Sequence, residues 1–167
     1  MIIEAFDLML STNEAAKQSN CLKRKIGVVV PVGQGETVFG YNTSAEPCQT
    51  CHRSTCSAVH AEVVAVTNLV MFQENRDASS LYIWAEVPCH ACLSFIRRYS
   101  SITRVYCLSA ESYLTEYPLI ARRSEEISQR REYAKSLGID IIELDREELL
   151  QYELFKRNKT DVQPDKA

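Results

Sequence analysis

Two short motifs in this 167-residue chain hold the side chains best suited to chemistry, residues 60–62 (His-Ala-Glu) and residues 88–92 (Pro-Cys-His-Ala-Cys). Each motif stands where a helix is expected to begin. Cys89 and Cys92 lie three positions apart, so on a helix their sulfur atoms share a face and can reach one ion. His60 can approach the same ion from the start of the other helix. One imidazole and two thiolates make an open zinc site, with a fourth position left for water.

Glu62 would supply the acid and base chemistry at such a site. Zinc lowers the pKa of a bound water towards neutrality, which makes that water the nucleophile. A carboxylate beside it can take the proton and return it to a leaving amine. The helix start at Cys89 and Cys92 also favours thiolates, because unpaired N–H groups and the helix dipole stabilise negative charge. We therefore expect a catalytic zinc ion held by His60, Cys89 and Cys92, with Glu62 as acid and base.

A second group of possible metal ligands precedes His60. The stretch from residue 45 to 57 has no helical or strand periodicity, so we expect a loop that packing alone does not order. Its cysteines include a pair with the spacing of a zinc half-site. The set we favour for a closed structural zinc site is Cys21, Cys48, Cys51 and Cys56, with His52 in reserve. The alternative is that these are reduced cysteines in a loop, and Cys107, inside a predicted strand, is expected in the core.

Composition limits the classes of protein and of partner. Apolar residues make up 46% and charged residues 25% of the chain, which is ordinary globular usage. The formal net charge of −3 argues against a nucleic-acid partner and favours a small-molecule substrate. No apolar run approaches the roughly 20 residues of a membrane span, and the first ten residues lack the basic leader of a signal peptide. We therefore expect a cytoplasmic protein with reduced cysteines and no membrane partner.

Periodicity predicts repeated strand-helix-strand units, and therefore an α/β layered domain. We expect a single domain over residues 1–157 and a loose polar tail over 158–167. The expected helices span residues 2–16, 58–72, 89–99, 119–137 and 145–156. The expected strands span residues 26–32, 37–39, 81–85, 102–108 and 139–144, the first two joined as a hairpin.

The joint pattern of residues 60–62 and 88–92 is the signature of zinc-dependent deaminases. A Cys-x-x-Cys pair alone could equally be a redox pair or half of a structural site, and His-Ala-Glu alone carries little information. With residues 21, 25–28 and 40–42, the chain resembles the cytidine and deoxycytidylate deaminase superfamily, and within it the phage-type deoxycytidylate deaminases.

That resemblance implies a three-layer fold in which helices flank a central five-stranded mixed sheet. It also implies hydrolysis of deoxycytidylate (dCMP) to dUMP with release of ammonia, by attack at C4 of cytosine. Asn42 would contact the sugar, and Ala61 would lie in the substrate site. Members of the superfamily commonly form dimers or hexamers, so a homo-oligomer is expected.

A basic run, Lys23-Arg24-Lys25, lies where the superfamily has its sugar and phosphate contacts. We expect these basic side chains to bind the phosphate group of the nucleotide. The alternative is a solvated basic turn, since short charge clusters usually lie at the surface. Arg122 and Arg123 are weaker candidates for the same role.

Two departures from the superfamily bear on the substrate. Thr43 and Ser44 follow the Gly-Tyr-Asn turn where members regulated by nucleoside triphosphates carry a glycine and then a proline. Residues 84–87 (Trp-Ala-Glu-Val) replace the usual threonine-led segment, which alters the pocket wall over the base. The alternative substrates are therefore 5-substituted dCMP, dCTP, cytidine, guanine and tRNA adenosine.

Two rival classes of protein stay open. One is a non-catalytic zinc module that binds a protein partner, in which Glu62 would have no catalytic role. The other is a deaminase-fold toxin or antiviral effector.

Overall fold

The computed structural model describes residues 2–21, 24–44, 58–72, 78–111 and 124–160. Its helices are α1 (Ile2–Ala16), α2 (Ala61–Phe72), α3 (His90–Tyr99), α5 (Ser124–Ser136) and α6 (Arg146–Thr160). Its strands are β1 (Gly27–Gly33), β2 (Glu36–Tyr41), β3 (Ser80–Ile83), β4 (Arg104–Leu108) and β5 (Asp140–Leu144). No helix in the part of the chain that the structure describes is long and apolar enough to cross a membrane.

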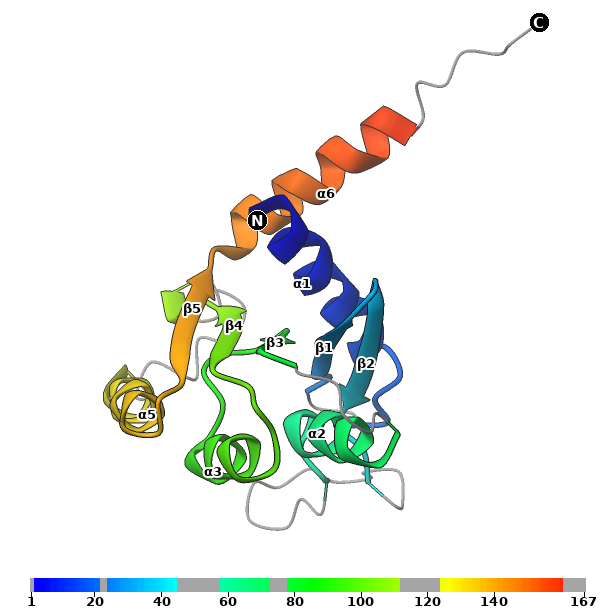
Figure 1. Cartoon of the computed structure of the whole chain (residues 1–167). Helices are drawn as coiled ribbons and strands as arrows, with labels where there is room; N and C mark the ends of the chain where they lie inside the picture. The colour runs from blue at the N-terminus through cyan, green and yellow to red at the C-terminus, as the bar shows by residue number, and fades with distance from the viewer. Residues whose placement is uncertain (1, 22–23, 45–57, 73–77, 112–123, 161–167) are drawn as a thin grey trace, which may run out of the picture.

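The five strands form one mixed sheet in the order β2-β1-β3-β4-β5. The first three strands in this order pair antiparallel, whereas β3, β4 and β5 pair in parallel. Helices α2, α3 and α5 lie on one side of the sheet, and α1 and α6 lie on the other (Figure 1). The expected three-layer fold with a five-stranded mixed sheet is therefore confirmed.

Side-chain alternation along β1 explains why both faces of the sheet are covered. Val28 and Val30 are fully buried against α2 and α3 in the larger core cluster. Val29, between them, points to the other face and packs with Met9 of α1 and Leu149 of α6 in the second cluster. Successive strand residues face opposite sides, so the continuous apolar run of β1 requires helices on both faces.

Gly40 lets α2 sit directly on the edge of the sheet. A Cβ atom at Gly40 would lie 2.5 Å from both the Ala61 carbonyl oxygen and the Ala65 nitrogen. Only a residue without a side chain allows so close an approach. Because Ala61 is the first residue of α2, this contact fixes where the helix begins and where His60 and Glu62 lie.

Some element boundaries differ from the sequence predictions. The helix expected from residue 58 begins at Ala61, because Val59 instead pairs with Thr43 through two backbone hydrogen bonds of 2.7 and 3.2 Å. The helix expected from residue 119 is described from Ser124, since residues 112–123 lie outside the described part.

The last helix was expected to end near Lys156, with a loose tail from residue 158. It instead continues to Thr160, so residues 158–160 are helical, and Arg157 forms an ion pair with Glu153 one turn earlier. Residues 161–167 lie outside the described part of the chain.

Candidate metal centre

His60, Cys89 and Cys92 meet at one point between α2 and α3. The Nδ1 atom of His60 lies 3.7 Å from the Cys89 sulfur and 3.3 Å from the Cys92 sulfur. The three ligand atoms all lie within 4.8 Å of one another, and they form the sole such cluster found among the described residues. Ligands around a tetrahedral zinc ion at its usual bond lengths are about 3.6 Å apart. The donor set and its spacing therefore fit zinc.

The backbone explains how the two cysteines are presented. Cys89 is the N-cap of α3, and its carbonyl accepts the hydrogen bond of Leu93 N–H at 3.0 Å. Cys92 follows in the first turn and is buried. Parallel strands β3 and β4 both end near this turn, and the carboxyl ends of parallel strands are where α/β proteins place their sites.

The two thiols share their charge unequally. The pKa of Cys89 is lowered to about 3, because the Cys92 thiol donates a hydrogen bond to its sulfur, although burial opposes this shift. The pKa of Cys92 is raised, because it donates that hydrogen bond and is buried beside Glu62. The pair of thiols therefore loses its first proton readily, from Cys89. Loss of the second proton, from Cys92, requires a nearby cation that stabilises the second negative charge. Such a pair is suited to bind a metal ion.

Glu62 lies beside the ligands with its side chain almost fully enclosed, at 5% exposure. Burial raises the pKa of its carboxyl group, while its own backbone N–H and the positive charge of His60 act in the opposite direction. A hydrogen bond with Cys92 also lowers this pKa, which places the carboxyl group next to the ligand cluster. A buried carboxyl group with a raised pKa can carry a proton close to neutral pH.

Asn42 and His60 are held on neighbouring segments. The backbone of Thr43 pairs with that of Val59. Asn42 immediately precedes Thr43, and His60 immediately follows Val59, so this pairing brings Asn42 and His60 onto adjacent segments. The side-chain oxygen of Asn42 accepts the Ile26 N–H at 2.8 Å, and its amide nitrogen donates to the Arg24 carbonyl at 2.8 Å. Asn42 thus fixes the chain that carries the basic run, and its amide retains one N–H for a ligand.

The other predicted substrate residues are placed as follows. Ala61 is fully buried against the sheet. Arg24 is half-buried, and its guanidinium lies 3.6 Å from the Glu86 carboxylate. Lys25 is exposed. Lys23, Arg122 and Arg123 lie outside the described residues.

Of the predicted structural zinc ligands, the structure describes Cys21 alone, which is buried. Cys48, Cys51, Cys56 and the reserve ligand His52 lie outside the described residues. Cys107 is fully buried in β4, as expected for a core residue.

Sequence reasoning missed the buried ion pairs behind the metal site. Glu86 is 4% exposed, and its carboxylate lies 3.5 Å from the guanidinium of Arg130 on α5. The unusual acidic residue in segment 84–87 therefore forms ion pairs with Arg24 and Arg130. One signal was available, since a charged residue in an apolar run requires a buried partner.

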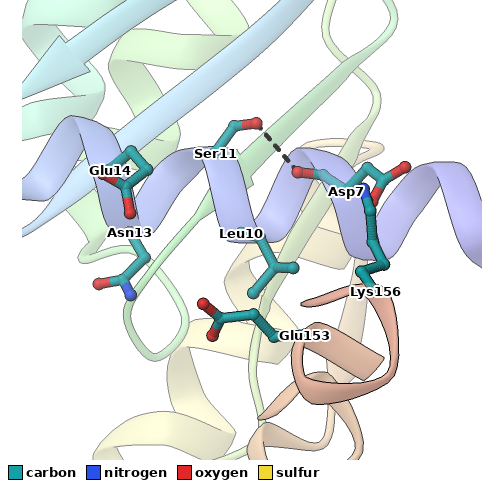
Figure 2. Close-up of a pocket in the computed structure, with 7 residues that line it drawn as sticks. All are labelled: Asp7, Leu10, Ser11, Asn13, Glu14, Glu153 and Lys156. Atoms are coloured by element: carbon teal, nitrogen blue, oxygen red, sulfur yellow. Dashed lines mark hydrogen bonds and ion pairs between the residues drawn. The ribbon is translucent and has the colours of Figure 1, made fainter. Parts of the chain in front are cut away.

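A cavity of about 310 Å³ lies elsewhere, between α1 and α6 (Figure 2). It is lined by side chains from these two helices, among them Asp7, which forms an ion pair of 2.7 Å with Lys156. It contains none of the predicted site residues.

The mixed sheet, the cluster of one histidine and two cysteines, and the buried Glu62 beside it fit the class of zinc-binding deaminases. The chain belongs to the cytidine and deoxycytidylate deaminase family: the model of the cytidine and deoxycytidylate deaminase zinc-binding region matches residues 4–109. A relative named deoxycytidylate deaminase, from Mycobacterium phage D29, is 34% identical over an alignment 110 residues long, which covers 54% of this chain and 83% of the relative.

Solved structures support the same fold. The dCMP deaminase of cyanophage S-TIM5 in its apo form superposes with a TM-score of 0.62 at 20% identity, over 84% of this chain and 97% of that one. The diaminohydroxyphosphoribosylaminopyrimidine deaminase/5-amino-6-(5-phosphoribosylamino)uracil reductase of Thermotoga maritima gives a TM-score of 0.58 at 19% identity. That match covers 98% of this chain and 44% of the other. At these identities the likeness concerns the fold.

Proposed function

We propose that the chain hydrolyses dCMP to dUMP and ammonia. The observation that carries this proposal is the cluster of His60, Cys89 and Cys92 with the buried carboxyl group of Glu62 beside it. The choice of dCMP draws support from the phage D29 relative, named deoxycytidylate deaminase, and from the S-TIM5 enzyme, whose structure was solved in complex with dCMP and dUMP.

His60, Cys89 and Cys92 would hold the zinc ion. When bound, zinc supplies hydroxide near neutral pH by lowering the pKa of water. Glu62 takes the proton that water releases and delivers it to N3 of cytosine, which prepares C4 for attack. After hydroxide has added to C4, Glu62 transfers the proton of the new C4 hydroxyl group to the exocyclic nitrogen, and the C4–N bond breaks to release ammonia and leave the C4 carbonyl of dUMP. Its raised pKa suits it to hold the proton between these steps.

The basic run would recognise the 5′-phosphate. Asn42 holds the backbone on both sides of Lys25, which sets Arg24 and Lys25 next to the residue expected to contact the sugar. Loss of a charge-assisted hydrogen bond costs about 1.5–3 kcal/mol. We therefore expect kcat/KM for dCMP to exceed that for deoxycytidine by about 10- to 100-fold.

A substrate panel tests the proposal. Deoxycytidine, its mono-, di- and triphosphates and 5-substituted dCMP are each given to zinc-loaded protein, and ammonia release is followed. The highest kcat/KM is expected for dCMP. A higher value for a 5-substituted form or for dCTP would reassign the substrate, and absence of turnover with every nucleotide would overturn the deaminase proposal.

We also propose a second, structural zinc site made by Cys21, Cys48, Cys51 and Cys56. Support comes from Asn20, next to Cys21, whose side chain bonds both backbone groups of Ser44 at 2.8 and 3.1 Å. Ser44 is the last described residue before the cysteine-rich segment, so Cys21 lies close to where that segment begins.

Elemental analysis of purified protein is expected to give two zinc ions per chain. One ion per chain would exclude the structural site and leave the catalytic site intact.

A homo-oligomer, either a dimer or a hexamer, and a cytoplasmic location complete the proposal. They follow from the family habit and from the reduced cysteines that a zinc enzyme needs.

A further inference from the structure

Helix α5 contacts the turn that presents the zinc ligands. The guanidinium of Arg130 donates a hydrogen bond of 3.1 Å to the carbonyl oxygen of Val87, two residues before Cys89. The same nitrogen lies 3.5 Å from the Glu86 carboxylate, and the other terminal nitrogen bonds Glu126 on α5 itself. The guanidinium group of Arg130 therefore joins the turn to α5 at two points, Glu86 and Val87, and Glu126 holds the group in place from within α5.

Tyr133, one turn further along α5, contacts the ligand-bearing helix itself. Its hydroxyl lies 2.7 Å from the hydroxyl of Ser94. Its ring meets the ring of His90 edge-on, with the centroids 4.8 Å apart. His90 stands between the two cysteine ligands in sequence, and Ser94 follows the second of them. Arg130 and Tyr133 are three residues apart and so face the same way.

Burial raises the free-energy cost of breaking the contacts of Arg130. Arg130 is 8% exposed and Glu86 is 4% exposed. A buried charge is tolerated when it is paired and hydrogen-bonded, and removal of one partner leaves the other uncompensated. The turn before Cys89 is thus tied to α5 by a contact that cannot shift without cost.

We propose that Arg130 and Tyr133 are positioning residues for the catalytic zinc site, which hold the sulfur atoms of Cys89 and Cys92 in reach of His60. Neither residue is a member of the ligand cluster. Both act through the turn and the first turn of α3. The family match ends at residue 109, so this assigns a part of the metal site to the last third of the chain. Zinc affinity and the cobalt spectrum test this assignment directly, and only the description of the zinc site as catalytic rests on the proposed function.

The experiment compares zinc retention in folded variants by competition with a chromophoric chelator. Removal of a group that orients metal ligands typically weakens metal affinity by 10- to 100-fold. We expect Arg130→Met to lose affinity by that factor, and Tyr133→Phe to lose less. Cobalt(II) in the site is expected to give a weaker and shifted tetrahedral absorption spectrum in Arg130→Met.

Two controls separate positioning from general stability. Arg131→Met removes the neighbouring arginine of α5, whose ion pair with Glu143 lies on the outer side at 2.6 Å. Leu149→Ala destabilises the core on the opposite face of the sheet, where Leu149 is fully buried. Both variants are expected to retain zinc with the affinity of the parent protein, although Leu149→Ala melts at a lower temperature.

Equal zinc affinity in Arg130→Met and in the parent would overturn the proposal, as would an equal loss in Leu149→Ala. Should Arg130→Met fail to fold, Arg130→Lys and Tyr133→Phe carry the test. Arg130→Lys keeps the charge but cannot form the same fork of hydrogen bonds, so its zinc affinity is expected to be lower than that of the parent protein. Parental affinity and an unchanged cobalt spectrum in both variants would also overturn it. If the parent turned over no nucleotide, the zinc and cobalt readouts would still decide the matter.

Discussion

Replacement of Glu62 with Gln is expected to lower kcat for dCMP by about 10²- to 10⁴-fold, the usual contribution of a positioned acid and base. Glutamine keeps nearly the same shape and can still form hydrogen bonds, but it cannot accept and return a proton. Glu62 is 5% exposed, so solvent cannot easily take over the proton transfer. The zinc content of the variant is expected to equal that of the parent, because Glu62 is absent from the ligand cluster.

A matched control uses another carboxylate of the chain. Glu143 of β5 is partly buried and pairs with Arg131. Glu143→Gln makes the same chemical change far from α2 and α3, and is expected to keep kcat within about twofold of the parent. Turnover of Glu62→Gln at the parental rate would remove Glu62 from the mechanism. Loss of zinc from this variant would show instead that the carboxylate supports the ligands.

The sequence predicted the fold well where local pattern and burial agree. The apolar run of β1 and the turn after it required a covered strand and a hairpin. Gly33, Gln34 and Gly35 do adopt positive φ angles of 89°, 53° and 78° in that turn. Prediction failed where a contact distant in sequence decides the local structure. The start of α2 is one example, because the pairing of Val59 with Thr43 holds residues that have helical spacing in an extended form.

The candidate site shows the same division. The residue types and spacing of His60, Cys89 and Cys92 were sufficient to predict that they form one cluster. The positions of these three side chains depend only on where two helices begin, which local sequence indicates. The role of Glu86 depends on Arg130, which lies 44 residues away, and no local pattern links the two. The departure of segment 84–87 from the family pattern predicted an altered pocket wall, and the structure adds that Glu86 of this segment forms a buried ion pair with Arg130 of α5.

Replacement of Cys92 with Ala is expected to lower the zinc content by one ion per chain and to abolish deamination. Cys92 is 2% exposed, and its sulfur lies closest to the His60 ring nitrogen, at 3.3 Å. Two remaining ligands hold zinc far more weakly than three. Cys107→Ala is the control, because it removes another buried thiol, in β4, where burial raises the pKa and keeps the thiol neutral. This control is expected to retain the parental zinc content despite a small loss of stability.

Thermal unfolding with and without chelator separates loss of the metal from loss of packing. A ligand present at 1,000 times its dissociation constant stabilises the folded state by about 4 kcal/mol, so chelation is expected to lower the melting temperature of the parent and of Cys107→Ala by the same amount. Cys92→Ala has already lost this stabilisation, and its shift must be smaller. Any shift that remains in Cys92→Ala measures the second zinc ion, since no other metal is left to remove. Equal shifts in Cys92→Ala and Cys107→Ala would mean that Cys92 contributes packing and not a ligand.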